Sequence, residues 1–302
     1  MSSWNQVLKE VRDAPGVIDA ERERAVTRLA ALRGRNVICY YSGWLQVSDP
    51  YGTSISDDDM NGLMNAVCDL DRGKGLDLVL HTPGGDLAAT EAIVNYIRDC
   101  FGNNVCAIVP QMAMSAGTMI ACSCREILMG RQSSLGPTDP QLGGVAAGGV
   151  VEEFERAVEE IGRRPDSAVL WGQIIGKYHP TFIGDCQKAV EMSESLVRDW
   201  LLRNMLSGEE LADGEDPVAV AEAIVGLLCD HRASAMHNRH FNHVQLEKIG
   251  MHISMLEDDN DLQDAVLTMH HTFMITFQQL APTKIIESSS GARWVTAPSP
   301  SS

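Results

Sequence analysis

Two short stretches of the chain contain the residue types that nucleophilic catalysis requires. The first is His81-Thr82-Pro83-Gly84-Gly85-Asp86, and the second, further along, is Ala113-Met114-Ser115-Ala116-Gly117-Thr118. A serine hydroxyl is a useful nucleophile only when a base takes its proton and fixed donors stabilise the charge that develops on the attacked carbonyl. Ser115 is the candidate nucleophile because it stands directly before a run of small residues that is expected to be helical.

The same two stretches supply candidate donors for an oxyanion hole. A helix that begins just after Ser115 leaves the backbone N–H of Ala116 without an intrahelical partner and directed at the reacting carbon. Gly84 and Gly85 can turn the backbone without a side-chain clash and expose the Gly85 N–H as a second donor. Taken singly, a Pro-Gly-Gly turn and a serine N-cap are common structural features. Their order in adjacent strand–helix units is what favours a catalytic interpretation.

Alternating strands and helices are expected to position these two stretches. Short β-branched and apolar runs at 37–41, 76–80, 105–109 and 127–129 predict strands, and helical patterns at 56–67, 88–97 and 116–124 separate them. Such alternation indicates parallel strands with right-handed crossovers. The second half is expected to be mainly helical, with helices at 151–161, 168–175, 185–206, 217–228 and 261–280, a small strand at 252–256, and a mobile glycine-rich loop at 143–149.

Composition and charge exclude several classes of protein. The formal charge of -17, from 24 basic and 41 acidic residues, repels a phosphate backbone and argues against nucleic-acid binding. The eight cysteines indicate buried thiols in a reducing compartment. No apolar run approaches the roughly 18 residues of a membrane span, and the charged N-terminal region lacks the apolar core of an export signal. A cytoplasmic protein without a transmembrane segment is therefore expected.

Neither a metal nor a cofactor is predicted. Cys122-Ser-Cys124 is too closely spaced for a typical zinc pair. His237, His240 and His243 recur at a spacing of three, which on a helix would put them on one face as possible metal ligands. The preferred interpretation is a polar loop near the site, because the segment resembles a stretch of the family named below.

Three runs carry a family resemblance: Leu80-His81-Thr82-Pro83-Gly84-Gly85, Val109 to Thr118, and Leu135 to Gly143. Together they closely resemble the serine dehydrogenase proteinase family, which is grouped with signal peptide peptidase A and Clp protease in the ClpP/crotonase superfamily. The likeness is strong over residues 76–143 and weaker to about residue 256. It implies an α/β fold, the ClpP/crotonase-like spiral of strand–helix units, with a helical C-terminal region. It also implies an oligomer of identical subunits, Ser115 as nucleophile, and an oxyanion hole formed by Gly85 of the Gly84-Gly85 loop and by Ala116.

The general base is harder to assign. Clp protease has a histidine shortly after its serine, whereas the similar segment here reads Ser134-Leu135-Gly136-Pro137. Signal peptide peptidases instead use a lysine from the helical region after the core, and Lys188 is the preferred candidate by similarity. Burial beside the serine would lower the pKa of such a lysine and let the neutral amine act as base. Ser134 is the candidate hydroxyl that orients the lysine, and Lys177 and His81 are the reserve bases.

These inferences predict an ATP-independent serine peptidase that acts on peptides or proteins with a Ser115/Lys188 dyad. The predicted organisation is an N-terminal helical arm at 1–35, the protease domain at 36–256, and a C-terminal helix with a flexible tail at 257–302. Apolar pairs inside that tail, Ile285-Ile286 and Trp294-Val295, are expected to contact either a neighbouring subunit or the same chain. Two alternatives stay open: a catalytically silent scaffold of the same fold, and a crotonase-like enzyme of acyl-CoA chemistry.

Overall fold

The computed structural model describes residue 8 and residues 18–207, 216–229 and 239–298. Residues 1–7 and 9–17 of the predicted N-terminal arm, His237, and the last four residues lie outside these ranges. Within them, every helix is too short or too polar to cross a lipid bilayer.

A seven-stranded sheet forms the centre of the molecule, in the order β11-β10-β1-β2-β3-β5-β9. Five neighbouring strands run parallel, as the alternation of strands and helices predicted. They are β1 (Asn36–Ser42), β2 (Leu76–His81), β3 (Val105–Val109), β5 (Glu126–Met129) and β9 (Ile253–Met255). Crossovers therefore bring the loops after β1, β2, β3 and β5 to one edge of the sheet, where sites form in folds of this kind.

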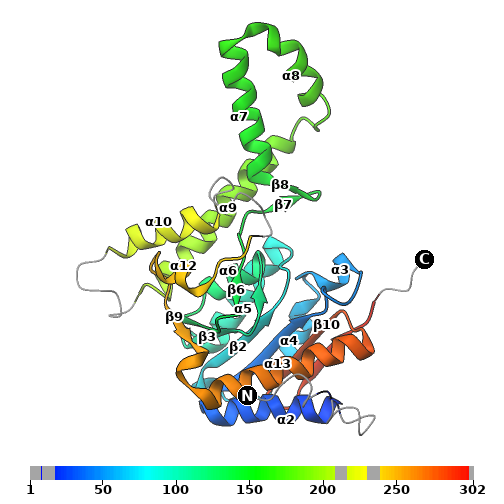
Figure 1. Ribbon diagram of the computed structural model, residues 1–302, viewed down its shortest axis with the longest axis vertical. Coiled ribbons are helices and arrows are strands. Elements are labelled where there is room, and N and C mark those ends of the chain that lie inside the picture. The colour runs from blue at the N-terminus through cyan, green and yellow to red at the C-terminus, as the bar shows by residue number, and fades with distance from the viewer. Residues whose placement is uncertain (1–7, 9–17, 208–215, 230–238, 299–302) are drawn as a thin grey trace.

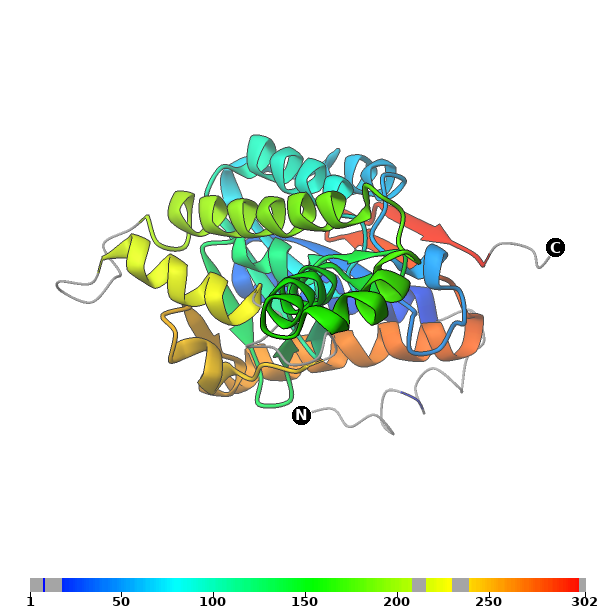
Figure 2. The same cartoon turned by 90° about the horizontal axis from the view of Figure 1, so that it is seen from above.

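Helices cover both faces of this sheet (Figures 1 and 2). On one face lie α2 (Ile18–Arg33) and α13 (Asn260–Leu280), packed on the odd-numbered side chains of β1, such as Cys39 and Tyr41. On the other lie α4 (Asp59–Val67), α5 (Leu87–Phe101) and α6 (Ala116–Cys122), with α9 (Phe182–Arg203) and α10 (Pro217–Leu228) outside them. Both faces of the parallel strands are buried, which explains their continuous apolar sequences.

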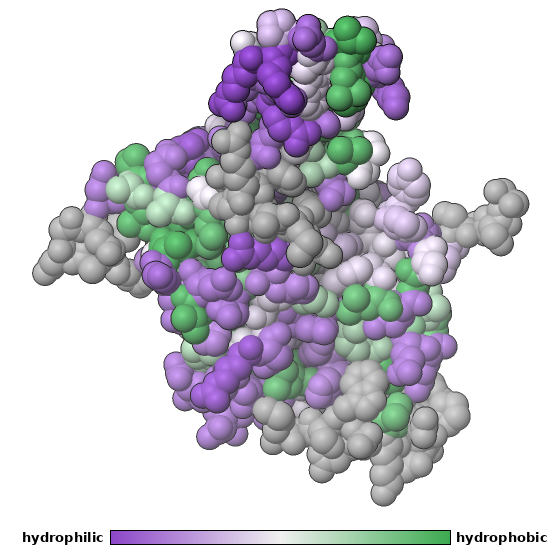
Figure 3. All heavy atoms as spheres, turned by 45° about the horizontal axis from the view of Figure 1, so that its top comes forward, coloured by the Kyte–Doolittle hydropathy of each residue, from purple (hydrophilic) through white to green (hydrophobic). Residues whose placement is uncertain are grey.

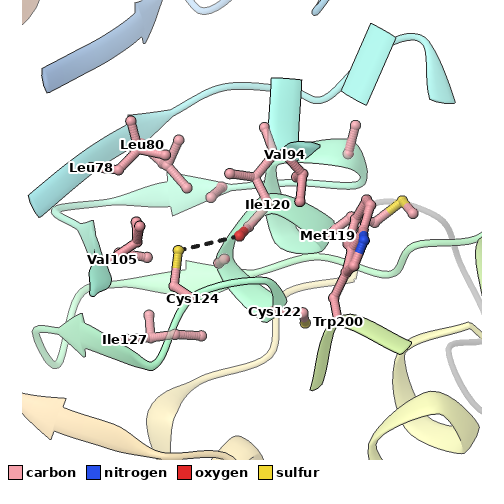
Figure 4. Packing of buried hydrophobic residues seen from close by; sticks show 14 of the residues in the cluster. Leu78, Leu80, Val94, Val105, Met119, Ile120, Cys122, Cys124, Ile127 and Trp200 are labelled. Carbon is pink, nitrogen blue, oxygen red and sulfur yellow. Dashed lines mark hydrogen bonds between the residues drawn. The ribbon is translucent and has the colours of Figure 1, made fainter. Parts of the chain in front are cut away.

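Small residues let α6 lie very close to the sheet. All seven residues of this helix are buried, and Ile120 and Cys122 pack between strand residues such as Leu78 and the indole of Trp200 on α9 (Figure 4). The thiol of Cys124 donates to the backbone oxygen of Ile120 at 3.4 Å. The N-terminus of α6, which carries Ser115, is therefore held on a closely packed element.

The cysteines are free thiols, and most of them are buried as predicted. Burial is complete or nearly so at Cys39, Cys106, Cys122, Cys124, Cys186 and Cys229. Cys68 differs because it is exposed, and Cys100 is half-buried.

A helical arm projects from the body above the carboxyl edge of the sheet (Figure 1). It consists of α7 (Ala147–Arg163), the short η2 (Pro165–Ser167) and α8 (Ala168–Ile175), and α7 packs on α9. The glycine-rich segment before it was predicted to be a mobile loop. It forms a hairpin of β7 (Gln141–Leu142) and β8 (Val145–Ala146), because Gly143 and Gly144 adopt the positive φ angles of 60° and 80° that such a turn requires.

The C-terminal segment also differs from its prediction as a flexible tail. Residues 284–288 form β10 and residues 293–296 form β11, and this antiparallel hairpin extends the central sheet beside β1. Ile286 is completely buried under α4. The apolar pairs Ile285-Ile286 and Trp294-Val295 thus contact the same chain.

The N-terminal region is likewise part of the body in the residues that the structure describes. Helix α2 packs along α13 and buries Val26 and Leu29 against the sheet. Its Arg22 is 1% exposed and forms an ion pair of 2.5 Å with Glu287 of β10. The remaining short helices, α3 (Pro50–Thr53) and α12 (His243–Glu247), lie in connections between the main elements.

Candidate active site

Ser115 lies at a sharp turn between a short strand and α6. The strand is β4 (Met112–Ala113), which pairs with β6 (Ser134–Leu135) in a small second sheet. The backbone of Ser115 has φ 50° and ψ -117°, a conformation that non-glycine residues rarely adopt. Strain of this kind accumulates where a fold over-determines a functional geometry.

The first residue of α6 provides one backbone donor beside this serine. Ala116 is buried and occupies the first helical position, where the N–H has no acceptor within the helix. The next N–H, that of Gly117, is already used, because it donates to the oxygen of Met114 at 2.8 Å. Ala116 therefore supplies the N–H that the sequence predicted at this end of the helix.

The loop after β2 provides a second donor. Ile55 pairs with it in a parallel bridge: the Ile55 N–H donates to the oxygen of Gly84 at 2.8 Å, and the Asp86 N–H donates to the oxygen of Ile55 at 2.9 Å. In parallel pairing, the residue between these two directs its own N–H away from the partner strand. Gly85 is that residue, and its N–H consequently faces away from Ile55.

Gly84 holds the two motifs in direct contact. It has φ 98°, and a Cβ atom placed on it would lie 2.6 Å from the Cβ of Ser115 and 2.9 Å from the nitrogen of Ala116. Its own N–H donates to the hydroxyl of Thr82 at 3.1 Å, so Gly84 shapes the loop and Gly85 keeps the available donor. Only glycine fits this position, because of both its positive φ and the missing space.

A cleft of about 620 Å³ opens between these two turns and α9. Ser115, Ala116, Gly84, Gly85 and Lys188 all line it. The rest of its wall is mostly apolar and includes Leu87, Met119, Leu142, Ala189 and Met192. The structure thus brings the predicted nucleophile, the two residues predicted as oxyanion donors and the preferred lysine to one cavity.

Lys188 stands on the second turn of α9 with its side chain 80% exposed. Its ammonium nitrogen lies 3.9 Å from the carboxylate of Asp185. Lys177, the reserve lysine, is exposed beyond the end of α8 and is not part of the cleft wall. Of the two lysines, only Lys188 shares a cavity with Ser115.

Ser134 lies in β6, outside the wall of the cleft. Its hydroxyl is 2.8 Å from Nδ1 of His240, a residue in the extended segment that pairs with β6 through Phe241. The structure therefore gives Ser134 a histidine partner rather than Lys188.

His81, the other reserve base, points to the opposite face of the sheet. It is completely buried, its ring centroid lies 4.4 Å from that of Trp44 and 5.3 Å from that of His270, and neither ring nitrogen has a hydrogen-bond partner among the described residues. Burial, followed by the neighbouring His270, holds the pKa of His81 well below its usual range. Its contacts belong to the layer beneath α13.

Two contributors to this site were not predicted. Thr82 stands two residues before Gly84, a spacing at which threonine hydroxyls commonly bind backbone N–H groups, so local sequence contained that signal. Ile55 contacts the loop through a bridge between distant segments, and nothing in its own sequence surroundings indicates this contact.

The buried histidine His270, on the face of α13 that packs on the sheet, predicts an acid-sensitive stability. Burial lowers the pKa of His270 from 6.5 to about 3, and His271 contributes in the same direction. Between these pH values the unfolded chain binds a proton that the folded chain does not bind, so the free energy of unfolding decreases as the pH falls. We expect His270→Phe to reduce that dependence by about 1.4 kcal/mol per pH unit between pH 6 and pH 4.

Urea unfolding at several pH values measures this effect, and His179→Phe is the matched control because His179 is exposed. An unchanged pH slope in His270→Phe would contradict the assignment.

Comparison with known proteins identifies a protein family whose model matches this sequence. A family model described as ClpP-like SDH-type serine proteinase matches residues 16–170, which is about half of the chain and contains both turns of the site. The predicted ClpP-like α/β fold is confirmed by this match together with the observed parallel sheet and its crossover helices.

Individual relatives share limited sequence identity with this chain. The uncharacterized protein MJ1495 of Methanocaldococcus jannaschii is 27% identical over 156 residues, which cover 52% of this chain and 50% of that protein. The uncharacterized protein MJ0137 of the same organism is 35% identical over 102 residues, which cover 34% of this chain and 35% of that protein. The chain thus spans half or less of the length of these relatives. A mutant of the membrane-bound stomatin-specific protease 1510-N aligns with 15% identity and a TM-score of 0.38, over 70% of this chain and 79% of that chain.

Proposed function

Because this chain belongs to the family of ClpP-like SDH-type serine proteinases, we propose that it hydrolyses peptide bonds with Ser115 as the nucleophile. The observation that carries this proposal is the strained turn of Ser115 against the Gly84-Gly85 loop at the wall of an open cleft. Gly84, which no other residue can replace, packs against Ser115 and helps to keep it in this strained conformation. A nucleophile that is fixed in this way is preorganised for attack.

The proposed reaction follows from the positions of these groups. The Oγ atom of Ser115 attacks the carbonyl carbon of the bound peptide while its proton passes to a neutral amine, that of Lys188. The N–H groups of Gly85 and Ala116 stabilise the oxyanion that forms. Collapse breaks the C–N bond, and the leaving amine takes the proton from Lys188. Water then cleaves the acyl ester and regenerates the Ser115 hydroxyl, so neither ATP nor a cofactor takes part.

Lys188 needs a change of surroundings to act as this base. In the free cleft its side chain is 80% exposed and lies near Asp185, so water solvates its charge. Removal of water from around the amine favours its neutral form. A peptide bound along the cleft would remove that water, because it would cover the apolar wall around Ala189 and Met192. We therefore propose that substrate binding completes the base.

The arm supports the proposal of a homo-oligomer. Val158, Val169 and Leu170 are 74%, 73% and 60% exposed on α7 and α8, and apolar patches mark the arm in Figure 3. Exposed apolar groups that lie on a projecting element are typical of contact surfaces. We propose that this surface packs on another copy of the chain.

Labelling of the folded chain with a fluorophosphonate tests the function directly. The reagent reacts with an activated serine and should form one adduct, located by peptide mapping at Ser115. The same protein unfolded in urea should stay unlabelled. An absence of labelling in the folded protein, or an adduct at Ser54 or Ser134, would favour a catalytically silent scaffold instead.

The base is tested by Lys188→Ala. General bases typically contribute about 10²-fold to 10⁴-fold, and we expect the turnover of a peptide substrate to fall by at least about 10²-fold. Lys177→Ala is the matched control, because that lysine lies outside the cleft wall, and it should keep full activity. Equal activity of Lys188→Ala and the wild-type chain would transfer the role to another group.

A further inference from the structure

A buried ion pair connects the C-terminal hairpin to helix α4. Lys284, the first residue of β10, has a side chain that is 4% exposed, and its ammonium nitrogen lies 2.5 Å from a carboxylate oxygen of Asp59, whose side chain is completely buried. Burying two charges is costly unless additional polar contacts satisfy both groups. The polar contacts of Lys284 and Asp59 therefore show which segments of the chain this ion pair fixes.

The carboxylate of Asp59 is fixed from two sides. Its second oxygen accepts hydrogen bonds from the hydroxyl of Tyr40 at 2.7 Å and from the N–H of Ser56 at 3.0 Å. Burial, together with Asp59, raises the pKa of Tyr40 well above its usual value, which keeps the phenol protonated as a donor. Asp59 is thus a rigid anchor for Lys284.

The remaining donors of Lys284 reach the segment before α4. The ammonium group donates to the backbone oxygen of Ser54 at 2.9 Å and to the hydroxyl of Ser56 at 3.3 Å. The preceding carbonyl, that of Thr53, accepts from the hydroxyl of Ser42 at 2.6 Å, and Ser42 is opposite Lys284 in the sheet register. The backbone carbonyls of Thr53 and Ser54 are therefore fixed by hydrogen bonds from side chains of β1 and β10, respectively.

Ile55 follows directly and is the residue that pairs with the oxyanion loop. Its N–H binds the oxygen of Gly84, and its oxygen binds the N–H of Asp86. The peptide bond that joins Gly84 to Gly85 lies between these two hydrogen bonds, and its N–H faces away from Ile55. A displacement of the segment held by Lys284 would consequently rotate or shift that donor.

We propose that Lys284 is a positioning residue for the oxyanion loop. It acts through Ser54 and Ile55 on Gly85, and this assignment rests on the proposed function of Ser115. Lys284 lies beyond the residues that the family model matches, which end at 170. The C-terminal hairpin therefore supports the catalytic geometry as well as extending the sheet.

The same strand offers a matched control. Glu287 of β10 forms an equally buried ion pair with Arg22, but on the opposite face of the sheet, beneath α2 and α13. Arg22 also contacts Thr276 and Asp19, Glu287 also contacts Arg293, and none of these contacts involves the segment around Ile55. Loss of Lys284 leaves the buried Asp59 without its cation, and loss of Arg22 leaves the buried Glu287 with only the more distant Arg293, at 3.4 Å. Both losses break a buried ion pair of β10, whereas only the loss of Lys284 frees the oxyanion loop.

The test compares Lys284→Met with Arg22→Met in the full chain, using the rate of fluorophosphonate labelling and peptide kinetics. We expect Lys284→Met to lower the labelling rate and kcat by about 10-fold to 100-fold, with KM changed by less than about threefold because the apolar part of the cleft wall, around Leu87, Ala189 and Met192, is not held by Lys284. Arg22→Met should be destabilised but label at the wild-type rate. Equal labelling rates in the two variants would overturn the proposal.

A second variant keeps the proposal testable if Lys284→Met does not fold. The double variant Lys284→Met/Asp59→Asn removes both charges, so it should regain stability while still lacking the donor to Ser54. It should still label slowly, and wild-type labelling of this variant would also overturn the assignment.

Hydrogen exchange separates a failure of this inference from a failure of the proposed function. The Asp86 N–H, bonded to Ile55, should exchange faster in Lys284→Met and in the double variant than in Arg22→Met. A wild-type chain that is never labelled would remove the proposed function. Unchanged exchange at Asp86 in both Lys284 variants would remove the positioning role by itself.

Discussion

Ser115→Ala is expected to lower peptide hydrolysis by at least about 10⁴-fold, because loss of a nucleophilic serine removes the covalent route and leaves only the oxyanion hole and binding. Fluorophosphonate labelling should disappear with it. The measurement is kcat/KM for a peptide substrate together with the mass of the labelled protein. Ser54→Ala is the control, since Ser54 lines the same cleft and lacks the strained turn.

A companion substitution separates catalysis from strain. Ser115 has φ 50° and ψ -117°, a conformation in which a Cβ atom is unfavourable and glycine is not. Ser115→Gly should therefore be inactive and yet gain about 1 kcal/mol in free energy of unfolding. A loss of stability in Ser115→Gly would show that the hydroxyl, and not the backbone, dominates the energetics of the turn.

Gly84→Ala is expected to lower turnover by about 10³-fold, because the new methyl group acts on the nucleophile and a donor at once. The added Cβ would lie 2.6 Å from that of Ser115, 2.8 Å from the oxygen of Met114 and 2.9 Å from the nitrogen of Ala116. These are backbone or near-backbone atoms, so a side-chain rotation cannot relieve the contact. Peptide kinetics and thermal unfolding measure the effect.

Gly102→Ala is the matched control for backbone strain. Gly102 has a φ of 60° after α5, and a Cβ atom there would meet no heavy atom within 4 Å. Both substitutions place an L-residue at positive φ, but only Gly84→Ala disturbs the site. Similar losses of activity in the two variants would indicate general destabilisation rather than a displaced nucleophile.

The parts of this protein that local sequence predicted are those in which local forces dominate. β-branched and apolar runs specified the strands around Cys39, Val79 and Ile108, and small residues after Ser115 specified a helix that can approach the sheet closely. Helical spacing located α8, α10 and α13 to within a residue of their observed bounds. In each of these segments, the pattern of apolar residues and the preference of the backbone agree.

The C-terminal hairpin shows where such reasoning stops. Serine and proline content near residues 282–302 favoured a flexible tail. Pairing with β1 decided otherwise, since an apolar strand edge is stabilised by any segment that supplies hydrogen bonds and apolar side chains. Partners so far apart in the chain leave no local trace, and the ion pair of Lys284 with Asp59 follows the same rule.

Sequence by itself determined the two turns of the candidate site, because a nucleophile before a helix and a glycine pair after a strand are local arrangements. It also determined the alternation that brings these turns to one edge of the sheet. Only the tertiary structure decided that Lys188 lines the cleft with Ser115 while His81 faces α13, and that Ser134 meets His240. Those relations depend on how distant elements pack, and packing is a property of the whole chain rather than of any one segment.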